Sequence, residues 1–343
     1  MVWGAGRDRD VPHEVRYEPS VVVLLPCYNE EHTIADVVRR FRATLPGAPI
    51  YVYDNNSSDL TALRARAAGA IVIREPRQGK GNVVRRMFAD IEADIYLMAD
   101  GDGTYAPEDA PQLINTLLTE RSDMVVGTRR GVTDDAGRSG HAFGNRLFNS
   151  LYKRLFGLDF TDIFSGYRVF TRRFVKSFPA VSGGFEIETE MSVHASQLKL
   201  PVSEIALDYG RRPAGSSSKL STYRDGARIL WMFAMLLKET RPLRFFGVFA
   251  AFFLVSSLVL MAPVLIEYTE TGLVPRLPTW VLSVALLLLS VLAMVSGLIL
   301  DSVSRGRAEQ KRIFYLSIPA SRAPEHSERA DSALPPGRAP RVA

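Results

Sequence analysis

The sequence contains almost no cysteine and no dense cluster of basic residues. Cys27 is the single cysteine among 343 residues, which excludes an intramolecular disulfide framework and a cysteine-based zinc site and fits a reducing compartment. The 42 Lys and Arg residues barely exceed the 37 Asp and Glu residues. Because no Lys/Arg run is interleaved with aromatic residues, nucleic acid is not expected as a partner. A hydrophobic fraction of 47% excludes wholesale disorder.

Residues 1–19 lack an apolar segment, which argues against a cleaved secretory signal and predicts a disordered N-terminal segment. Against a usual domain size of about 150 residues, the chain has room for two units or for one domain with appendages. The composition divides the rest into an α/β domain, an amphipathic helix, an apolar hairpin, and a basic segment with a disordered tail. We place these four parts at 20–221, 222–243, 244–301 and 302–343.

Short aliphatic runs alternate with amphipathic stretches through the first of these parts. The runs predicted as buried strands are 21–25, 50–54, 70–74, 95–100 and 123–127. Helical spacing marks 33–44, 60–68, 81–91 and 107–118. This alternation predicts an α/β fold with a mostly parallel sheet and helices on both faces. In such sheets ligands bind beyond the carboxyl ends of the strands.

Two long runs near the C-terminus carry no charge. Residues 245–266 and 279–300 are 22 residues each, and a helix of that length is about 33 Å long, enough to cross a hydrocarbon core of about 30 Å. A pair of buried core helices is the alternative, but charge-free runs of this length are rare in soluble folds. Basic residues flank both outer ends, and the connecting loop 267–278 contains two glutamates and one arginine. This asymmetry predicts that both termini are cytoplasmic.

Two amphipathic stretches precede these runs. Residues 142–157 fit a helix packed on its own domain as well as one in the membrane interface. For residues 222–239, which lead towards the first apolar run, we favour the interface.

The sharpest local motif is Asp100-Gly101-Asp102, which follows a predicted strand. Two carboxylates separated by glycine can converge on Mg²⁺ or Mn²⁺, which prefer oxygen ligands and share them with phosphates. Alone, this tripeptide is more often an ordinary turn. Here the apolar strand before it and the sequence Gly103-Thr104-Tyr105 after it favour a site.

Other strands are also followed by polar residues. Tyr28 could pack near a base, and Asp54 could accept hydrogen bonds from a base or ribose, although residues 55–59 also fit a turn with a helix cap. Around Gly79 and Lys80, backbone N–H groups could approach a nucleotide, but the spacing is not that of a P-loop.

In this order the motifs resemble family 2 glycosyltransferases with a GT-A nucleotide-sugar fold. The similarity is to the polyprenyl-phosphate branch, which includes dolichyl-phosphate mannose synthase and bactoprenol-phosphate glucosyltransferases. It covers about residues 20–240 and extends to two C-terminal membrane helices. The motifs are LLPCYNEEHTI, VYDNNSSDLT, QGKGN, ADGDGTY, VGTRR, NRLFN, DIFSGYR, GFEIETE and RRPAGSSSK.

The resemblance implies inverting transfer of a sugar from a nucleoside diphosphate to a lipid phosphate. It implies a donor site formed by Pro26, Tyr28, Glu30, Asp54, Gly79, Lys80, Asp100, Gly101 and Asp102. Asp100 and Asp102 would hold the Mg²⁺ or Mn²⁺ ion and the diphosphate, with Asp102 also counted as catalytic. The acceptor phosphate would be bound by Arg129, Arg146, Arg168 and Arg212, with Arg211 as the alternative to Arg212.

Physical chemistry supports arginines at such a site. A phosphate monoester is largely a dianion at pH 7, so it needs positioning more than a general base. Arg offers paired, permanently charged donors for this purpose, although a single surface arginine is usually just solvated. Asp162 would orient an arginine or act as a catalytic base, and we favour orientation. Among Glu186, Glu188 and Glu190, one could face the acceptor, but the absence of nearby histidines argues against a second metal site.

We therefore expect a membrane-bound glycosyltransferase that makes a polyprenyl-phosphate sugar at the cytoplasmic face. A UDP-hexose or UDP-N-acetylhexosamine is favoured as donor, with GDP-mannose as the other candidate. The alternatives are a transferase acting on a sugar or lipid hydroxyl, a processive polysaccharide synthase, and a catalytically inactive membrane scaffold. The partners expected are the donor, the lipid and the bilayer, and the family resemblance adds a homo-oligomer.

Overall fold

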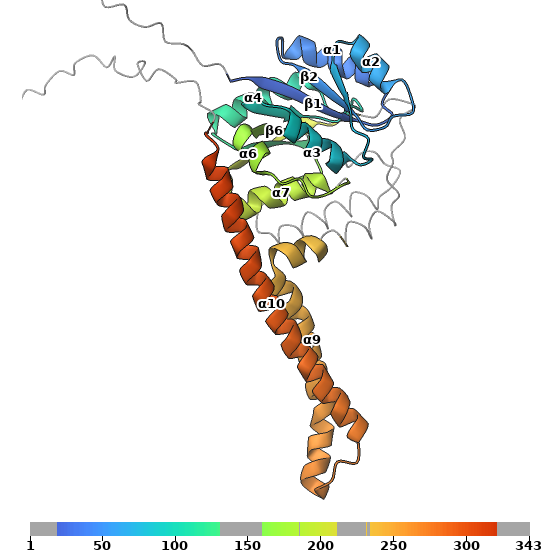
Figure 1. Cartoon of the computed structure of the whole chain (residues 1–343), viewed down its shortest axis with the longest axis vertical. Helices are drawn as coiled ribbons and strands as arrows, with labels where there is room; N and C mark the ends of the chain where they lie inside the picture. Colours follow the sequence, from blue (N-terminus) through green and yellow to red (C-terminus); the bar gives the residue numbers. More distant parts are fainter. Residues whose placement is uncertain (1–18, 131–159, 185, 211–230, 232–233, 321–343) are drawn as a thin grey trace, which may run out of the picture.

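The computed structural model describes residues 19–130, 160–184, 186–210, 231 and 234–320. In these residues, an α/β domain lies at one end of a long antiparallel pair of helices (Figure 1). The N-terminal segment to residue 18, the amphipathic stretch 142–157, most of the predicted interface helix and the tail from residue 321 lie outside the described residues.

Four parallel strands form the first half of the sheet, as the sequence pattern predicts. They are β1 (Val21–Cys27), β2 (Ile50–Asp54), β3 (Ile71–Arg74) and β4 (Ile95–Met98), joined by α1 (Ile34–Thr44), α2 (Thr61–Ala67) and α3 (Lys80–Asp90). Strands β1 and β4 are almost completely buried, because helices cover both faces of the sheet.

The second half of the sheet contains an antiparallel strand that the sequence pattern does not predict. The elements are η1 (Pro107–Asp109), α4 (Ala110–Thr119), β5 (Met124–Arg130), β6 (Arg168–Thr171), α6 (Arg172–Ser177), α7 (Ile187–Leu198) and β7 (Val202–Asp208). Strand β6 lies between β4 and β5 and runs antiparallel to both, which gives the order β3-β2-β1-β4-β6-β5-β7. Its four residues are too few for an alternating pattern to reveal it. The mostly parallel α/β fold is confirmed.

Two apolar layers hold the sheet between its helices. On one face, Phe88 of α3 contacts Phe170 of β6 with ring centres 5.7 Å apart, and Phe170 stacks on Phe174 at 4.9 Å. On the other face, Val38 and Phe41 of α1 are buried in a separate cluster. Each such side chain contributes about 1.5–3 kcal/mol when fully buried. These layers fix the strand order that brings the loops after β1, β2 and β4 to one edge.

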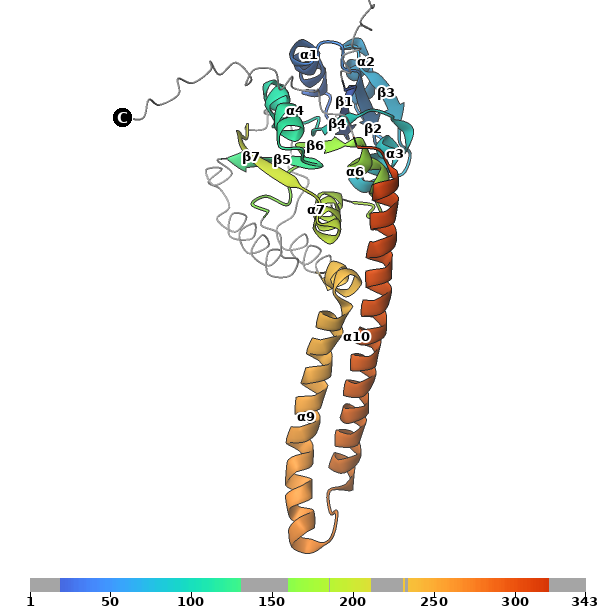
Figure 2. The ribbon, with the colours of Figure 1, turned by 90° about the vertical axis from the view of Figure 1, so that its left-hand side faces the viewer.

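The hairpin consists of α9 (Pro242–Thr271) and α10 (Leu277–Ser317), which run side by side in both ribbon views (Figure 2). Buried residues recur every seventh position on each helix: Ala250, Ser257 and Val264 on α9, and Ser283, Ser290 and Gly297 on α10. The hydroxyls of Ser257 and Ser290 donate to carbonyls of the opposite helix at 2.7 and 2.8 Å. Small residues with interhelical hydrogen bonds are typical of membrane helix pairs.

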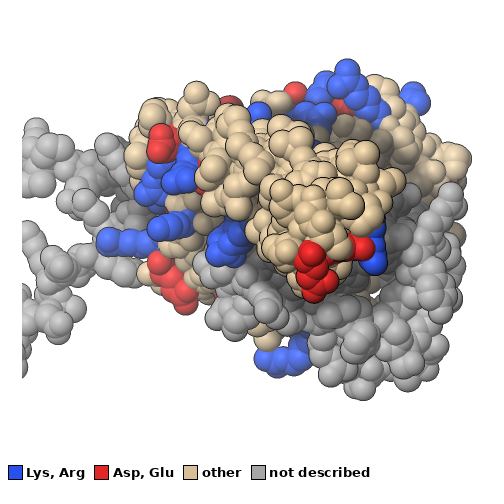
Figure 3. Space-filling view, turned by 90° about the horizontal axis from the view of Figure 1, so that it is seen from below, with Lys and Arg blue, Asp and Glu red and all other residues tan. Residues whose placement is uncertain are grey.

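Both hairpin helices are long and apolar enough to cross a membrane, and only 17% of the most apolar window of each is buried. Core helices of a soluble domain would be mostly buried, so the structure favours the membrane interpretation over that alternative. Seen from below, uncharged side chains cover the hairpin, charged residues of both signs lie near its tip, and basic residues with some acidic ones lie around it on the underside of the domain (Figure 3).

The last helix extends past the predicted boundary at residue 302. Helix α10 continues without a break to Ser317 and runs along α7 and α6 (Figure 1). The basic residues of the predicted juxtamembrane segment lie on this helix. Arg312 donates to the carbonyl oxygen of Leu198 at the end of α7 at 2.7 Å. The segment from 302 to 317 is therefore a structural part of the α/β domain.

Tyr315 anchors this end of α10 in the core. Its side chain is buried, and its hydroxyl donates to Asp123 Oδ2 at 2.5 Å. Asp123 is fully buried and also accepts hydrogen bonds from Thr171 at 2.8 Å and from Arg173 at 2.7 and 3.1 Å. The guanidinium groups of Arg173 and Arg312 lie 4.8 and 5.4 Å from the centre of the Tyr315 ring. Residues 123, 171, 173 and 315 form what we call the Tyr315 clasp.

Part of the predicted interface helix is described. Residues 234–240 are helical, and α9 begins directly after Arg241. Leu236 packs against the larger apolar cluster of the α/β domain. Ser304 of α10 donates to the carbonyl oxygen of Glu239 at 2.9 Å. This short helix therefore contacts both the domain and the hairpin.

Tyr315→Phe tests the clasp. It removes a hydrogen bond to a buried carboxylate, so we expect a loss of about 1.5 kcal/mol in stability and a fall in melting temperature of about 3–6 °C. Thermal unfolding of the full chain in detergent measures this. Leu316→Ala is the control, because Leu316 is exposed in the same turn. An unchanged melting temperature for Tyr315→Phe would contradict the clasp.

Candidate active site

The loops after β1, β2 and β4 meet at the carboxyl edge of the sheet and bind one another. Cys27 and Asp54 are register partners at the ends of β1 and β2. The Asn29 N–H donates to Ser57 Oγ at 2.9 Å, and the Ser58 N–H donates to Asn29 Oδ1 at 2.8 Å. Parallel strands place these loops together, as the sequence predicts.

The predicted donor residues of the first two loops lie at this edge. Tyr28 is 37% exposed, so its ring is accessible to a ligand. Asp54 is 6% exposed, and its Oδ1 is buried without a hydrogen-bond partner among the described residues. A buried acceptor without a partner is costly, so the position fits a donor group supplied by a ligand.

Asn55 has a structural role that was not predicted. The sequence suggested only that it belongs to a turn. Its amide group donates to the carbonyl oxygens of Glu75 and Arg77 at 3.1 and 2.7 Å. Its Oδ1 accepts a hydrogen bond from the Gly79 N–H at 2.7 Å. Asn55 thus fixes the loop that leads into α3.

Gly79 and Gly81 are required by packing in this structure. A Cβ atom on Gly79 would lie 2.1 Å from the carbonyl oxygen of Gly183, and one on Gly81 would lie 2.1 Å from that of Ser182. Gly79 also has a φ of +127°, where L side chains are disfavoured. From the sequence, backbone N–H groups around Gly79 were expected only to approach a nucleotide. The close contact with the segment before α7 is the reason that the structure provides.

Lys80 lies at the centre of the site. Its Nζ is 2.5 Å from Asp100 Oδ1 and 2.5 Å from Glu188 Oε1. Burial lowers the pKa of Lys80, but the two carboxylates outweigh it, so the pKa lies above its usual value. Lys80 is therefore a fixed positive charge between β4, α3 and α7. Of the three glutamates that the sequence left open, Glu188 is the one that contacts this group.

The Asp-Gly-Asp turn is tightly packed. Asp102 is 4% exposed, and its Oδ1 accepts hydrogen bonds from the Thr104 N–H and hydroxyl at 3.1 and 2.6 Å. A Cβ on Gly101 would lie 2.4 Å from Cys27 Sγ. Burial and nearby carboxylates raise the pKa of Cys27 well above its usual value, which fits a packing role for this thiol.

Gly166 packs directly against Asp100. A Cβ atom at this position would lie 2.6 Å from Asp100 Oδ2 and 3.1 Å from Oδ1. Gly166 belongs to the segment before β6, so the antiparallel strand brings it to the Asp-Gly-Asp turn. The glycine therefore sets the position of the Asp100 carboxylate.

The residues present fit a divalent metal that takes few ligands from protein. Asp100 and Asp102 supply hard oxygen donors one residue apart. The described residues contain no group of three or more His, Cys, Asp or Glu side chains arranged for a metal. An ion held here would take its other oxygens from water and a diphosphate, as Mg²⁺ commonly does.

Arg129 and Asp162 form a buried bidentate pair. Arg129 Nε and Nη2 donate to the two Asp162 oxygens at 2.7 and 2.8 Å. The Arg129 guanidinium also lies 5.5 Å from the centre of the Tyr209 ring. Burial raises the pKa of Asp162, but hydrogen bonds from Arg129 and from the backbone outweigh it, so the pKa lies below its usual value. This geometry orients the arginine and makes Asp162 a weak base.

The structure corrects the prediction for Arg168. Its side chain is fully buried, and it donates to the carbonyl oxygens of Ser165 and Ile163 at 2.8 Å each and to Ser192 Oγ at 3.0 Å. A guanidinium bound in this way supports the loop before β6 and does not face an acceptor phosphate. Arg146, Arg211 and Arg212 lie outside the described residues, so their predicted role stays a prediction.

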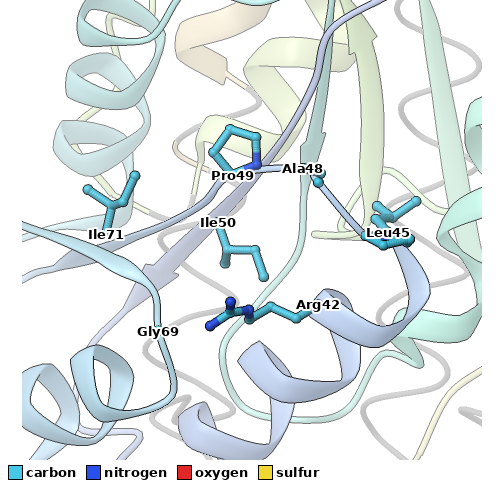
Figure 4. A pocket seen from close by; sticks show the side chains of 9 residues that line it. Arg42, Leu45, Ala48, Pro49, Ile50, Gly69 and Ile71 are labelled. Atoms are coloured by element: carbon cyan, nitrogen blue, oxygen red, sulfur yellow. The ribbon is translucent and has the colours of Figure 1, made fainter.

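A hollow of about 420 Å³ lies at the amino ends of β2 and β3, lined by Arg42, Pro49 and Ile71 among others (Figure 4). Arg42 donates to the carbonyl oxygen of Ala68 there at 3.3 Å. This hollow is at the opposite end of the strands from the carboxylates and is not part of the site.

Gly166→Ala tests the geometry around Asp100. The added methyl group must displace the carboxylate, so we expect Mn²⁺-dependent binding of UDP to weaken by about ten-fold. Calorimetry measures this binding. Gly306→Ala is the control, because a Cβ there meets nothing within 4 Å. Equal binding by the two variants would show that Asp100 does not depend on Gly166.

Comparisons with known proteins identify the family of this chain. The model of glycosyl transferase family 2 matches residues 22–178. The chain is 39% identical over 230 residues to glycosyltransferase AglJ of Haloferax volcanii, covering 66% of this chain and 75% of that protein. It is 27% identical over 222 residues to the undecaprenyl-phosphate mannosyltransferase of Micrococcus luteus, covering 57% of this chain and 86% of that protein.

A solved structure shares the fold. Glucosyl-3-phosphoglycerate synthase from Mycobacterium tuberculosis, in complex with Mn²⁺, uridine diphosphate and phosphoglyceric acid, is 25% identical with a TM-score of 0.53. The match covers 64% of this chain and 78% of that chain. The predicted GT-A fold and the resemblance to the polyprenyl-phosphate branch are confirmed, and the chain belongs to glycosyl transferase family 2.

Proposed function

We propose that this glycosyltransferase moves a sugar from a nucleoside diphosphate to a polyprenyl phosphate at the cytoplasmic face of a membrane, with inversion. The observation that carries the proposal is the cluster of Lys80, Asp100 and Asp102 at the carboxyl edge of a GT-A domain that is clasped to an apolar hairpin. The relative from Micrococcus luteus, named as an undecaprenyl-phosphate mannosyltransferase, supports the lipid acceptor.

On the donor side, Tyr28 and Asp54 would contact the base and ribose. Asp100 and Asp102 would hold Mg²⁺ or Mn²⁺, and such an ion neutralises the charge that develops on a departing diphosphate. Lys80 adds a permanent charge at the same place. The related synthase with bound Mn²⁺ and UDP supports a UDP-sugar, and the mannosyltransferase relative keeps GDP-mannose as the other candidate.

On the acceptor side, Arg129 would bind the lipid phosphate, with Arg146 and Arg212 as further ligands. Asp162 keeps the Arg129 guanidinium in one orientation, so the paired N–H donors are arranged before the substrate arrives. The phosphate dianion then needs no general base, because it is already ionised near pH 7.

The hairpin would bring the acceptor to the enzyme. Both helices would span the bilayer, with the acidic tip outside and the α/β domain and both termini in the cytoplasm. The basic residues around the hairpin in Figure 3 support this orientation, since they would face the anionic headgroups.

Asp102→Asn tests the donor site. Removing this charge takes away a metal ligand while keeping the shape of the turn, so transfer should fall by at least about 100-fold with the melting temperature unchanged. The measurement is product mass from undecaprenyl phosphate with a panel of nucleotide sugars. Asp36→Asn, at an exposed position of α1, is the control. Normal transfer by Asp102→Asn would contradict the metal site, and lack of transfer by the wild type would favour the inactive scaffold.

The pH profile distinguishes the two roles of Asp162. Its lowered pKa keeps this carboxylate ionised from pH 5 to 8, and the stability it contributes is present there and lost only in stronger acid. We expect turnover to fall as the pH drops through about 6, where the acceptor phosphate gains a proton. Asp162→Asn should raise the KM for the lipid and keep this midpoint. Loss of the acidic limb in the variant would show that Asp162 itself titrates near pH 6 during turnover, which would contradict both its lowered pKa and its orienting role.

A further inference from the structure

Glu188 lies in the first turn of α7, and its carboxylate points into the site with one oxygen unused. The side chain is 5% exposed, and Oε1 is 2.5 Å from Lys80 Nζ. Oε2 is buried and has no hydrogen-bond partner among the described residues. The amino end of a helix favours a negative charge, which suits a carboxylate at this position. Lys80 therefore has a second carboxylate partner, and one oxygen of that carboxylate can still accept a hydrogen bond.

Lys80 is shared by two carboxylates from different elements. Asp100 extends from the turn after β4, and Glu188 comes from α7 on the other side of the ammonium. An ammonium has three N–H donors and no acceptor, so it can serve both at once. One positive charge between two negative charges leaves an excess negative charge at the site, which suits an incoming cation.

Donor binding places a conflicting demand on Asp100. The Asp100 oxygen that accepts a hydrogen bond from Lys80 has less capacity to ligate a metal. Suppose that Asp100 were the only partner of Lys80. When Asp100 turned towards the metal, the buried Lys80 ammonium would be left unpaired, which is strongly unfavourable. Glu188 removes this difficulty, because its own bond to Lys80 persists and Oε2 can accept the N–H that Asp100 releases.

We propose that Glu188 is a positioning residue that retains Lys80 beside the diphosphate while Asp100 turns to the metal. The inference rests on the proposed donor site and adds a residue to it. Held by Glu188, the Lys80 ammonium stays where the leaving group gains charge, instead of following Asp100. Glu188 thus pairs with Lys80 while Asp100 binds the metal. Asp100 alone could not fill both roles at once.

Glu188→Gln in the full-length protein tests this role, because glutamine keeps the shape and loses the charge. The probes are UDP and GDP, each with and without Mn²⁺, measured by calorimetry. We expect Mn²⁺-dependent nucleotide affinity to fall by about ten-fold, and affinity without Mn²⁺ to change less than about two-fold. Without the metal, Asp100 still pairs with Lys80, so the missing charge has little effect.

Glu92→Gln is the matched control. Glu92 also pairs with a lysine, with Lys176 Nζ at 2.8 Å, but it is 61% exposed and outside the site. Nucleotide affinity should be unchanged in this variant with and without Mn²⁺. Glu188→Asp, which keeps the charge on a shorter side chain, should restore Mn²⁺-dependent affinity to within about three-fold of the wild type. A merely structural glutamate would not show this dependence on charge.

A double-mutant cycle with Lys80→Met shows whether Glu188 acts through Lys80. In the methionine background, Glu188→Gln should cause no further loss of Mn²⁺-dependent affinity, because there is no ammonium to position. An equal loss in both backgrounds would overturn the inference, as would unchanged Mn²⁺-dependent binding in Glu188→Gln alone. A wild-type protein that binds neither UDP nor GDP with Mn²⁺ would overturn the proposed donor chemistry as well.

Discussion

The buried ammonium of Lys80 is the interaction on which the site depends. It joins the turn after β4 to the first turn of α7 and begins α3 itself, so three elements meet at one charge. Close packing supports it from two sides. Gly166 approaches the Asp100 carboxylate, and Gly81 lets the segment before α7 approach α3. A larger side chain at either glycine would move a charged group at the centre of the site.

Helix α7 connects this charge to the rest of the molecule. Its first turn carries Glu188, and its last residue, Leu198, accepts the hydrogen bond from Arg312 of α10. This helix of 12 residues therefore contacts the site at the carboxyl edge of the sheet with its first turn and the hairpin with its last residue. The Tyr315 clasp holds α10 on the same side of the sheet, next to the amino end of β5.

The sequence predicted what local pattern encodes and missed what depends on distant contacts. Aliphatic runs predicted strands β1 to β5, although β3 is a partly exposed edge strand and not a buried one. The position of the Asp-Gly-Asp turn at the end of β4 was also predicted. Arg168 was misassigned because a sequence motif does not show that nearby carbonyl oxygens enclose the guanidinium. The attachment of the basic segment after 301 to the α/β domain was not predicted, because the partner of Tyr315, Asp123, is 192 residues away. Glu188 stood among three similar glutamates, and only the fold shows which one meets Lys80.

The α/β domain is attached to the hairpin in two places, through Leu236 before α9 and through Tyr315 at the end of α10. With a single attachment the domain could rotate relative to the hairpin, whereas two attachments on one side fix its orientation. Residues 302–317 continue α10 as a helix for about 24 Å alongside α7 and α6, so the domain is held rigidly against the end of the hairpin. In the proposed function, this fixed arrangement would present the active site to an acceptor phosphate at one depth beside the hairpin.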